Sequence, residues 1–378
     1  MLPEPEFTVG IEEEYLLVDR ASRDVVQDPP PELLAECKRE LAGQVSPEFL
    51  RSQIEIGTRV CRTMQEARAD LARLRGAVAR IADRFGMAPI AASTHPFARW
   101  HAQKPTDQDR YQELHRDLQG VARRLLICGL HVHVGLGDDE LRIDLMNQVR
   151  YFLPHLLALS TSSPFWGGED TGLKSYRVSV FDGMPRTGLP DRFESWGEYR
   201  RHVDLLVSAG LIEDATKLWW DVRPSDRFAT LEMRIADMCT RLDDAIAVAS
   251  LYRCLLRMLW RLKRDNRAWR IYARMLINEN RWRAQRYGTD EGLVDFGRRE
   301  IVPYRDLLEE IIALVAEDAE ALGCAAEVAH ARTIVARGTS AHAQLRILAE
   351  ATGASLARRD ALNAVVDWLI AETVNGIG

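Results

Sequence analysis

The stretch that most constrains this chain is residues 7–19, Phe-Thr-Val-Gly-Ile-Glu-Glu-Glu-Tyr-Leu-Leu-Val-Asp. At the two-residue period of a β-strand, its apolar side chains share one face: Phe7, Val9, Ile11, Tyr15 and Leu17. Glu12 and Glu14 point to the other face, where adjacent carboxylates repel each other unless a cation or water neutralises them. The stretch alone is typical either of an edge strand with a wet outer face or of a strand that lines a metal-binding cavity.

Three later stretches show the same alternation, and each is predicted to form a strand: residues 46–58, 130–135 and 227–235. Their polar faces carry acids, imidazoles and a guanidinium: Glu55, His131, His133, Glu232 and Arg234. Two histidines on one strand face can both reach one cavity, which allows a metal or phosphate site as well as two structural histidines. Four such strands predict an antiparallel sheet, with helices against its apolar face and a polar cavity on the other.

The polar-face residues indicate what such a cavity would bind. Four carboxylates can hold two or more hard divalent cations such as Mg²⁺ or Mn²⁺, and no cysteine stands among them to favour zinc. Arg234, with Arg223 shortly before it, favours an anion, most simply phosphate. The chain has neither GxxxxGKS/T nor GxGxxG, so metals and arginines would have to hold a nucleotide's phosphates.

The rest of the chain is predicted to be mainly helical. Apart from the four strands, the expected elements are a helix opened by the capping box at residues 63–66 and ending near Phe85, a short strand over 89–94, and helices over 107–128 and 138–160. Residues 163–190 form a long loop rich in Gly and Pro. From about Leu242 the pattern is helical to the end, and no linker divides the chain, so we expect a single domain over residues 1–378.

Composition excludes several classes of protein. The net charge of −6 argues against a general nucleic-acid binder, and the arginines between Arg253 and Arg286 are interpreted as a solvated helix face rather than a basic patch. No apolar run reaches the roughly 18 residues of a membrane span. Six scattered cysteines without a CxxC pair, and an N-terminus unlike a signal peptide, predict a cytoplasmic protein.

Some residues near these motifs have competing interpretations. Glu13 shares the apolar face of its strand, so we expect it to pair with a helix arginine and not to join the cavity. His95 can either contact a substrate or cap a strand end. Trp219 and Trp220 are interpreted as packing residues rather than a platform for adenine.

Taken together, these motifs resemble the glutamate–cysteine ligase type 2 (carboxylate–amine ligase) family and, more distantly, glutamine synthetase. The resemblance runs essentially from end to end and is strongest in Gly-Ile-Glu-Glu-Glu (10–14), Gln-Ile-Glu (53–55), Gly-Leu-His-Val-His-Val (129–134), Ser-Tyr-Arg (175–177) and Leu-Glu-Met-Arg (231–234). The segment 279–288 also looks like a family segment, although its residues do not indicate a role.

The resemblance implies a glutamine-synthetase-like α+β fold, in which a curved antiparallel sheet carries an ATP-binding funnel with two or three Mg²⁺ (or Mn²⁺) ions. It implies that ATP phosphorylates the γ-carboxylate of glutamate or a similar acid, and that cysteine or another amine then displaces phosphate to form an amide. At matching positions it implies these metal ligands: Glu12, Glu14, Glu48, Glu55, His131 and Glu232. It implies catalytic and phosphate-binding roles for His133 and Arg234, a phosphate contact for Arg223, and substrate contacts for Arg177, Tyr176 and His95.

Two other functions remain open at this point. A metal-dependent hydrolase can also carry an HxH strand, but it does not need several arginines in the same cavity. A non-catalytic nucleotide- or metal-binding protein on an inherited scaffold would bind ATP without turnover. The sequence does not identify the amine substrate, whose recognition we expect to involve the loop at residues 163–190. The resemblance also makes a homodimer plausible.

Overall fold

The structure is a computed structural model that describes residues 3–107 and 118–377. Its main sheet has seven antiparallel strands: β1 (Val9–Asp19), β2 (Val45–Pro47), β3 (Gln53–Gly57), β4 (Met87–Ile90), β5 (Leu130–Gly135), β10 (Val222–Pro224) and β11 (Thr230–Met233). The strand order is β10-β11-β5-β1-β3-β2, with β4 paired to the C-terminal half of β1. The first predicted strand is therefore the central one, paired along both edges, and not an edge strand.

The register of the sheet brings the predicted polar side chains together. Glu12 lies opposite His131 on β5, and Glu14 lies opposite Glu55 on β3. On the far side of β5, His133 lies opposite Glu232 of β11. Because directly opposite residues share a face, all of these side chains project from the same side of the sheet.

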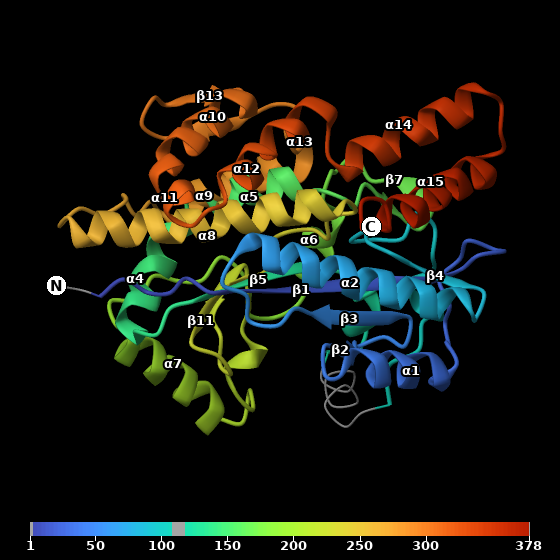
Figure 1. Cartoon of the computed structure of the whole chain (residues 1–378), viewed down its shortest axis with the longest axis horizontal. Helices are drawn as coiled ribbons and strands as arrows, with labels where there is room; N and C mark the ends of the chain where they lie inside the picture. Colours follow the sequence, from blue (N-terminus) through green and yellow to red (C-terminus); the bar gives the residue numbers. More distant parts are fainter. Residues whose placement is uncertain (1–2, 108–117, 378) are drawn as a thin grey trace.

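Helices make up most of the remaining described chain: α1 (Pro31–Leu41), α2 (Met64–Asp83), α4 (Asp139–Val149), α5 (Leu153–Ser160), α6 (Tyr176–Phe181), α7 (Trp196–Ser208), α8 (Leu242–Arg264), α9 (Arg274–Tyr287), α10 (Tyr304–Leu314), α11 (Ala316–Ala321), α12 (Ala325–Ala329), α13 (Ala331–Arg337), α14 (Ser340–Gly353) and α15 (Arg358–Thr373). Short 3₁₀ turns occur at η1 (Trp100–Ala102), η2 (Ala122–Arg124) and η3 (Ala215–Lys217). Figure 1 shows α8 to α15 stacked above the sheet, with α1 and α7 below it.

Helices α2, α8 and α15 pack against the apolar face of the sheet. Helix α2 begins at the predicted capping box, where the Thr63 side chain accepts from the Glu66 backbone and the Glu66 carboxylate accepts in return. The Glu13 carboxylate enters this helical layer and forms a buried ion pair with Arg75 of α2, which confirms the expected helix arginine. The sheet thus has a packed face and a polar face, as predicted.

Several predicted elements are wrong in detail. Residues 46–58 form two strands, β2 and β3, because the chain turns between them and Gln53 N–H donates to Leu50 O at 3.0 Å. The helix expected over 138–160 is two helices, α4 and α5; Pro154 lacks an N–H and its ring clashes with the carbonyl four residues earlier, so one helix cannot run through. The strand expected over 89–94 is β4, two residues shorter and shifted towards the N-terminus.

Other differences lie in the loops. Most of the helix expected over 107–128 falls on residues outside the described part of the chain, and after them only Leu118 and the turn η2 are helical. Three two-stranded ribbons were not predicted: β6 (Phe165–Trp166) with β7 (Glu169–Asp170), β8 (Thr187–Gly188) with β9 (Trp219–Trp220), and β12 (Leu293–Asp295) with β13 (Glu300–Val302). The last of these interrupts the otherwise helical C-terminal part.

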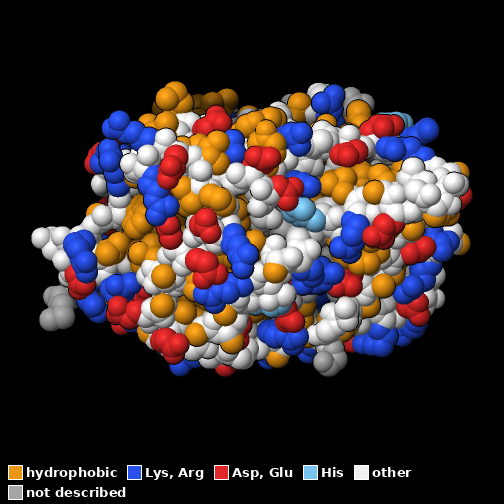
Figure 2. Space-filling model, turned by 90° about the horizontal axis from the view of Figure 1, so that it is seen from above, with side chains coloured by type: hydrophobic (Ala, Val, Ile, Leu, Met, Phe, Trp, Pro, Cys, Tyr) orange, Lys and Arg blue, Asp and Glu red, His pale blue; other side chains and the backbone are white. Residues whose placement is uncertain are grey.

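The arginines between Arg253 and Arg286 form the expected solvated face only in part: Arg264, Arg267, Arg270 and Arg274 are exposed, but the arginines on the inner side of α8 are not. Arg253 is buried and donates to the carbonyls of Phe7 and Arg62, each at 2.6 Å, while Arg257 pairs with Asp318 at 2.8 Å. Figure 2, which views the molecule from the helical side, shows Lys and Arg side chains intermixed with Asp and Glu rather than gathered in one patch. Among the helices described, none is long and apolar enough to cross a membrane.

Candidate active site

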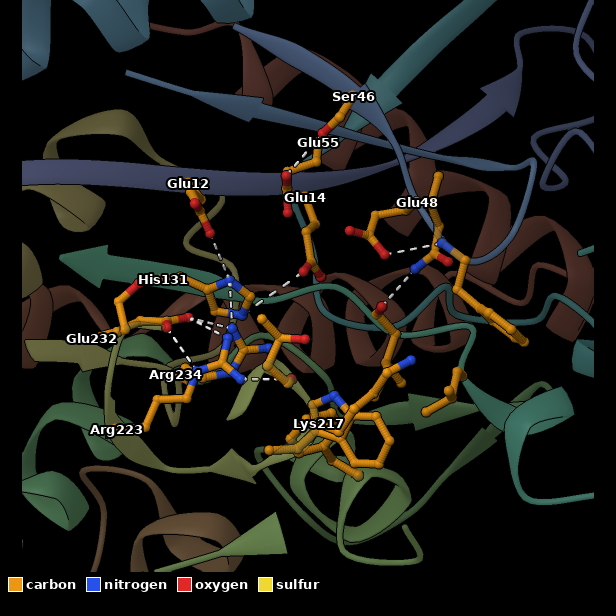
Figure 3. A pocket seen from close by; sticks show the side chains of 18 of the residues that line it. Glu12, Glu14, Ser46, Glu48, Glu55, His131, Lys217, Arg223, Glu232 and Arg234 are labelled. Atoms are coloured by element: carbon orange, nitrogen blue, oxygen red, sulfur yellow. Dashed lines mark hydrogen bonds and ion pairs between the residues drawn. The ribbon is translucent and has the colours of Figure 1, made fainter. Parts of the chain in front are cut away.

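The polar face of the sheet opens into a cavity of about 500 Å³ (Figure 3). Most side chains assigned to the site from the sequence line it: Glu12, Glu14, Glu48, Glu55, His131, His133, Arg177, Arg223, Glu232 and Arg234. They come from five strands, from the residue after β11, from the β2–β3 turn and from α6. Their convergence follows from the period-two alternation, which sends every second residue of neighbouring strands to one side.

One end of the cavity is a cluster of three acids. Glu14, Glu48 and Glu55 each offer an oxygen within 4.8 Å of the others. Burial, together with the neighbouring Glu55 charge, raises the pKa of Glu14 to about 7. Burial and Glu14 likewise raise the pKa of Glu48 to about 7, and burial raises the pKa of Glu55 well above its ordinary value. The charges of Arg177 and Arg234 lower the pKa of Glu14, but by less than burial and Glu55 raise it.

The middle of the cavity combines Glu12 with the two histidines. The Glu12 carboxylate lies 3.3 Å from His131 Nδ1 and 3.4 Å from His133 Nε2. Burial works against ionisation of Glu12, but its hydrogen bonds with His131 and His133 hold its pKa well below the ordinary value. Burial and the nearby Arg234 charge lower the pKa of His131 to about 4, so this imidazole is neutral at pH 7 and able to bind a metal.

The other end of the cavity is cationic and is organised around Glu232. The Arg223 Nε donates to Glu232 Oε2 at 2.8 Å, and Arg234 Nη1 donates to Glu232 Oε1. Burial opposes its ionisation, yet Arg234 and Arg223 hold the pKa of Glu232 well below its ordinary value. Arg177 donates to the backbone carbonyls of Arg234 and Ile235 at 3.1 and 3.2 Å, which ties α6 to the end of β11.

The donor atoms fit hard divalent cations. Within the described residues, three groups of side chains bring possible ligand atoms within 4.8 Å of one another: Glu12, Glu55 and His131; Glu12, His133 and Glu232; and Glu14, Glu48 and Glu55. Carboxylate oxygens with an occasional imidazole suit Mg²⁺ or Mn²⁺. The pKa values of the buried acids Glu14 and Glu48 are raised, as expected for carboxylates whose negative charges are only partly neutralised by the protein. A bound cation would neutralise them, so the residues fit a divalent metal. His133, assigned to phosphate from the sequence, also belongs to one of these groups.

Two residues assigned to substrate do not reach the cavity. His95 Nδ1 accepts from the N–H groups of Phe97 and Ala98, at 3.2 and 3.0 Å, and its Nε2 lies 2.8 Å from Arg23 O. It therefore holds the turn that follows it, a structural role, although this turn lies five residues beyond the end of β4 and is not the strand-end cap that was the alternative. Tyr176 begins α6 with its ring 5.3 Å from that of Trp166, and it is not among the residues that line the cavity.

The structure adds residues that the sequence did not single out for the site. Lys217 of η3 lines the cavity, together with Gln53 and Arg227. The loop 163–190 contributes Phe181 and Met184, and Trp219 also lies in the wall. Alternation on β3 would have found Gln53, but no sequence signal marks Lys217, because its position depends on how a loop packs.

Comparison with known proteins gives consistent matches. The sequence model of the family described as "Glutamate-cysteine ligase family 2" matches residues 8–364. A protein of Rhodospirillum rubrum named "Putative glutamate--cysteine ligase 2" is 64% identical over 379 residues, which cover 99% of this chain and 97% of that protein. The alternatives of a metal-dependent hydrolase and of a non-catalytic binding protein gain no support from these matches.

Solved structures share the fold at low identity. A glutamate–cysteine ligase of Francisella tularensis, solved in complex with AMP, matches with a TM-score of 0.71 at 12% identity over 100% of this chain and 91% of that one. A bifunctional glutathione synthetase of Pasteurella multocida matches with a TM-score of 0.69 at 15% identity over 97% of this chain. This chain spans only 52% of the length of that synthetase.

Proposed function

The chain belongs to glutamate–cysteine ligase family 2 and is an ATP-dependent ligase that forms a C–N bond, and we propose that its sheet cavity joins the γ-carboxylate of glutamate, or a similar acid, to cysteine or another amine. The observation that carries the proposal is the convergence of buried acids, two histidines and paired arginines in one cavity. A reaction between two polyanions needs cations between them, and this cavity supplies both metal ligands and guanidinium groups.

The residues divide into proposed roles by their place in the cavity. Those that would hold two or three Mg²⁺ or Mn²⁺ ions are Glu12, Glu14, Glu48, Glu55, His131 and Glu232. Bound there, the ions would neutralise charge on the phosphates of ATP. Arg223 and Arg234 bind phosphate oxygens beside Glu232, His133 contacts the phosphoryl group, and Arg177 contacts the donor acid. His95 and Tyr176 have no part in this proposal.

The chemistry follows in two steps. A γ-carboxylate oxygen of the donor forms a bond to the terminal phosphorus of ATP, and the bond from that phosphorus to ADP breaks. The amine nitrogen then bonds to the acyl carbon, the carbon–oxygen bond to phosphate breaks with its electron pair, and the amine loses a proton. The protein's own groups hold the anions in line and stabilise charge at the phosphorus, and no protein nucleophile is needed.

The proposal also includes the number of domains in the chain. We infer a single catalytic domain over residues 1–378, because Arg75 of α2 donates to the carbonyls of both Thr240 and Thr373 and so ties the first third of the chain to its end. Six buried free cysteines suit a reducing cytoplasm. A homodimer remains a prediction, which light scattering during gel filtration tests directly.

The test is product formation. The protein is incubated with ATP, Mg²⁺, glutamate and a panel of amines, and ADP, phosphate and amide are measured by coupled assay and mass spectrometry. With hydroxylamine in place of the amine, an acyl phosphate is trapped as the hydroxamate. The proposal expects ADP release that depends on both donor and acceptor, together with hydroxamate. ATP hydrolysis that ignores both substrates, or no hydroxamate with any donor acid, would overturn it.

A further inference from the structure

Lys217 brings a buried positive charge to the cavity that none of the roles above uses. It ends the turn η3, its side chain is 10% exposed, and it is one of the residues that line the cavity. Figure 3 shows Lys217 across the cavity from Glu14 and Glu55, on the same side as Arg223 and Arg234. A lysine whose side chain is mostly buried but whose ammonium lies at a cavity wall can bind an anion that enters the cavity.

The partner that Lys217 has within the described residues is weak. Its Nζ lies 3.8 Å from the Glu213 carboxylate, which is 56% exposed, and such a pair contributes little. The cavity's other buried guanidinium groups each have protein acceptors and already carry a role in the proposed function. Arg223 and Arg234 both pair with Glu232, and Arg177 donates to two backbone carbonyls.

The backbone around Lys217 is fixed by two arginines. Arg223 Nη1 donates to the carbonyls of Thr216 and Leu218, each at 2.9 Å, and Arg186 Nε donates to the carbonyl of Lys217 itself at 3.1 Å. The backbone carbonyls of residues 216 to 218 thus all accept hydrogen bonds from arginine side chains outside η3. Because Arg223 also binds Glu232, the position of Lys217 is coupled to the proposed phosphate end of the cavity.

The walls of the same cavity include apolar side chains that the metal and phosphate roles do not use: Leu125, Ile127, Phe181, Met184 and Trp219. A cation among apolar walls matches a small molecule with one carboxylate and a compact, mostly apolar remainder. An amino acid that acts as the amine substrate has this chemistry, whereas ATP has several charges, and the donor acid is already assigned to Arg177.

We propose that Lys217 binds the carboxylate of the amine substrate, so that this ligase selects amino acids over amines that lack a carboxylate. The inference rests on the proposed function, since it places the acceptor beside an acyl phosphate formed in the same cavity. It identifies Lys217 as a residue that determines specificity, and the apolar wall as the limit on the size of the acceptor's side chain.

The test compares acceptors that differ only in the carboxylate: L-cysteine against cysteamine, and L-alanine against ethylamine. In the wild type, kcat/KM is expected to be higher for the amino acid of each pair that reacts. Lys217→Met is expected to lower kcat/KM for the amino acids roughly 10- to 100-fold more than for the matched amines, because a charged hydrogen bond is lost. Lys217→Arg should restore part of the preference. Lys263→Met, which removes an exposed lysine of α8, is the matched control.

Hydroxylamine trapping separates this inference from the function beneath it, because hydroxylamine has no carboxylate. The loss in hydroxamate formation by Lys217→Met should be much smaller than its loss with amino acids. An unchanged preference for amino acids, or a rise in KM for ATP or glutamate as large as that for the amino acid, would overturn the assignment of Lys217 while the ligase function stands. A wild type that forms neither hydroxamate nor amide would refute the function, and the inference with it.

Discussion

The Arg75 guanidinium and the Glu13 carboxylate form a bidentate ion pair from which solvent is excluded. Arg75 Nη2 lies 2.6 Å from Glu13 Oε1 and Nε lies 2.8 Å from Oε2, with both side chains 0% exposed. Tyr15 donates a further hydrogen bond to Glu13, and Arg75 donates to the carbonyls of Cys239 and Thr240. The middle acid of the Glu-Glu-Glu run therefore joins the sheet to the helical layer, while its two neighbours face the cavity.

Replacing Glu13 should damage stability rather than chemistry. Glu13→Gln leaves the buried Arg75 charge without a counter-ion, and breaking such a pair typically costs about 3–5 kcal/mol of unfolding free energy. Urea unfolding measures the loss. Glu40→Gln, which breaks the exposed pair with Arg80, is the matched control and should leave the unfolding midpoint almost unchanged. If Glu13→Gln, like this control, unfolded at the same urea concentration as the wild type, the buried pair would not be a structural link.

The acid cluster predicts a pH-dependent stability that is visible only without metal. Folding raises the pKa of Glu48 to about 7, from an ordinary value of about 4.3, so the fold favours the protonated acid. Ionised Glu48 therefore costs stability progressively as pH rises through this interval, and the cost is constant above it. In EDTA, Glu48→Gln should become more stable than the wild type between pH 5 and pH 7.5.

The difference between the two proteins is the quantity to measure, by urea unfolding at each pH. Burial lowers the pKa of His155 to about 4, and the titration of such histidines changes the stability of both proteins alike, so it cancels. Added Mg²⁺ should reverse the order, because the wild type keeps all three acids to bind it. A difference that stays flat with pH would mean that Glu48 is ionised without cost.

Metal binding itself should depend on Glu55 and Glu232, which belong to different ligand groups. Glu55→Ala and Glu232→Ala are each expected to abolish Mg²⁺-dependent turnover and to weaken Mn²⁺ affinity by at least the roughly 10- to 100-fold that the loss of a ligand's outer-shell partner causes. Calorimetric titration with Mn²⁺ gives the affinity, and circular dichroism confirms that the fold remains. Near-normal turnover in both variants would rule out the metal cavity.

Much of the cavity was predictable because alternation along a strand is local. Glu12, Glu14, His131 and His133 could be assigned to one face from their own neighbours in sequence, and the structure places them there. Lys217 could not be, since arginines 31 residues before it and 6 residues after it hold its backbone in place. Local pattern fixes which way a strand residue points, but not where a loop lies.

The wrong predictions about the fold have the same cause, which is that non-local contacts cannot be read from a local pattern. The pattern in residues 46–58 continues through a turn that depends on pairing between β2 and β3, and pairing is not a local property. His95 shows how far a functional role can be predicted from sequence, because a histidine beside a proline can form hydrogen bonds with either a substrate or the backbone. The tertiary contact with Arg23 O decided between them.

Arg234 should not tolerate lysine. Its Nη1 donates to Glu232 and lies 3.5 Å from His131 Nδ1, so the planar guanidinium connects the acid to the histidine strand while facing the proposed phosphate. Lysine keeps the charge but offers a single ammonium group, so the fork is lost. Arg234→Lys is expected to lower kcat roughly 100-fold, as for the loss of one preorganised donor to developing charge. Steady-state kinetics with wild-type turnover and substrate constants would refute this role.

Buried contacts join the segment 279–288, whose residues gave no role, to the backbone of Arg234. Arg281 of α9 pairs with the Asp221 carboxylate, Nε to Oδ2 at 2.8 Å, and with Asp182 at 2.6 Å. The carbonyl of Asp221 in turn accepts from the N–H groups of Arg234 and Ile235, at 2.8 and 3.1 Å. Arg281 does not reach the cavity itself, so we expect any effect on the site to pass through Asp221.

Arg281→Met should lower kcat roughly tenfold, because small displacements of a charge-stabilising group are costly, while KM for ATP and for the acid changes little. It should also destabilise the fold, since Asp221 is left buried and unpaired. Arg281→Lys should recover more of kcat than of stability, because one ammonium can still reach Asp221, and Asp182→Asn, at the more exposed partner, should be milder in both. A loss of stability with normal kcat in the folded fraction would make Arg281 a structural residue only.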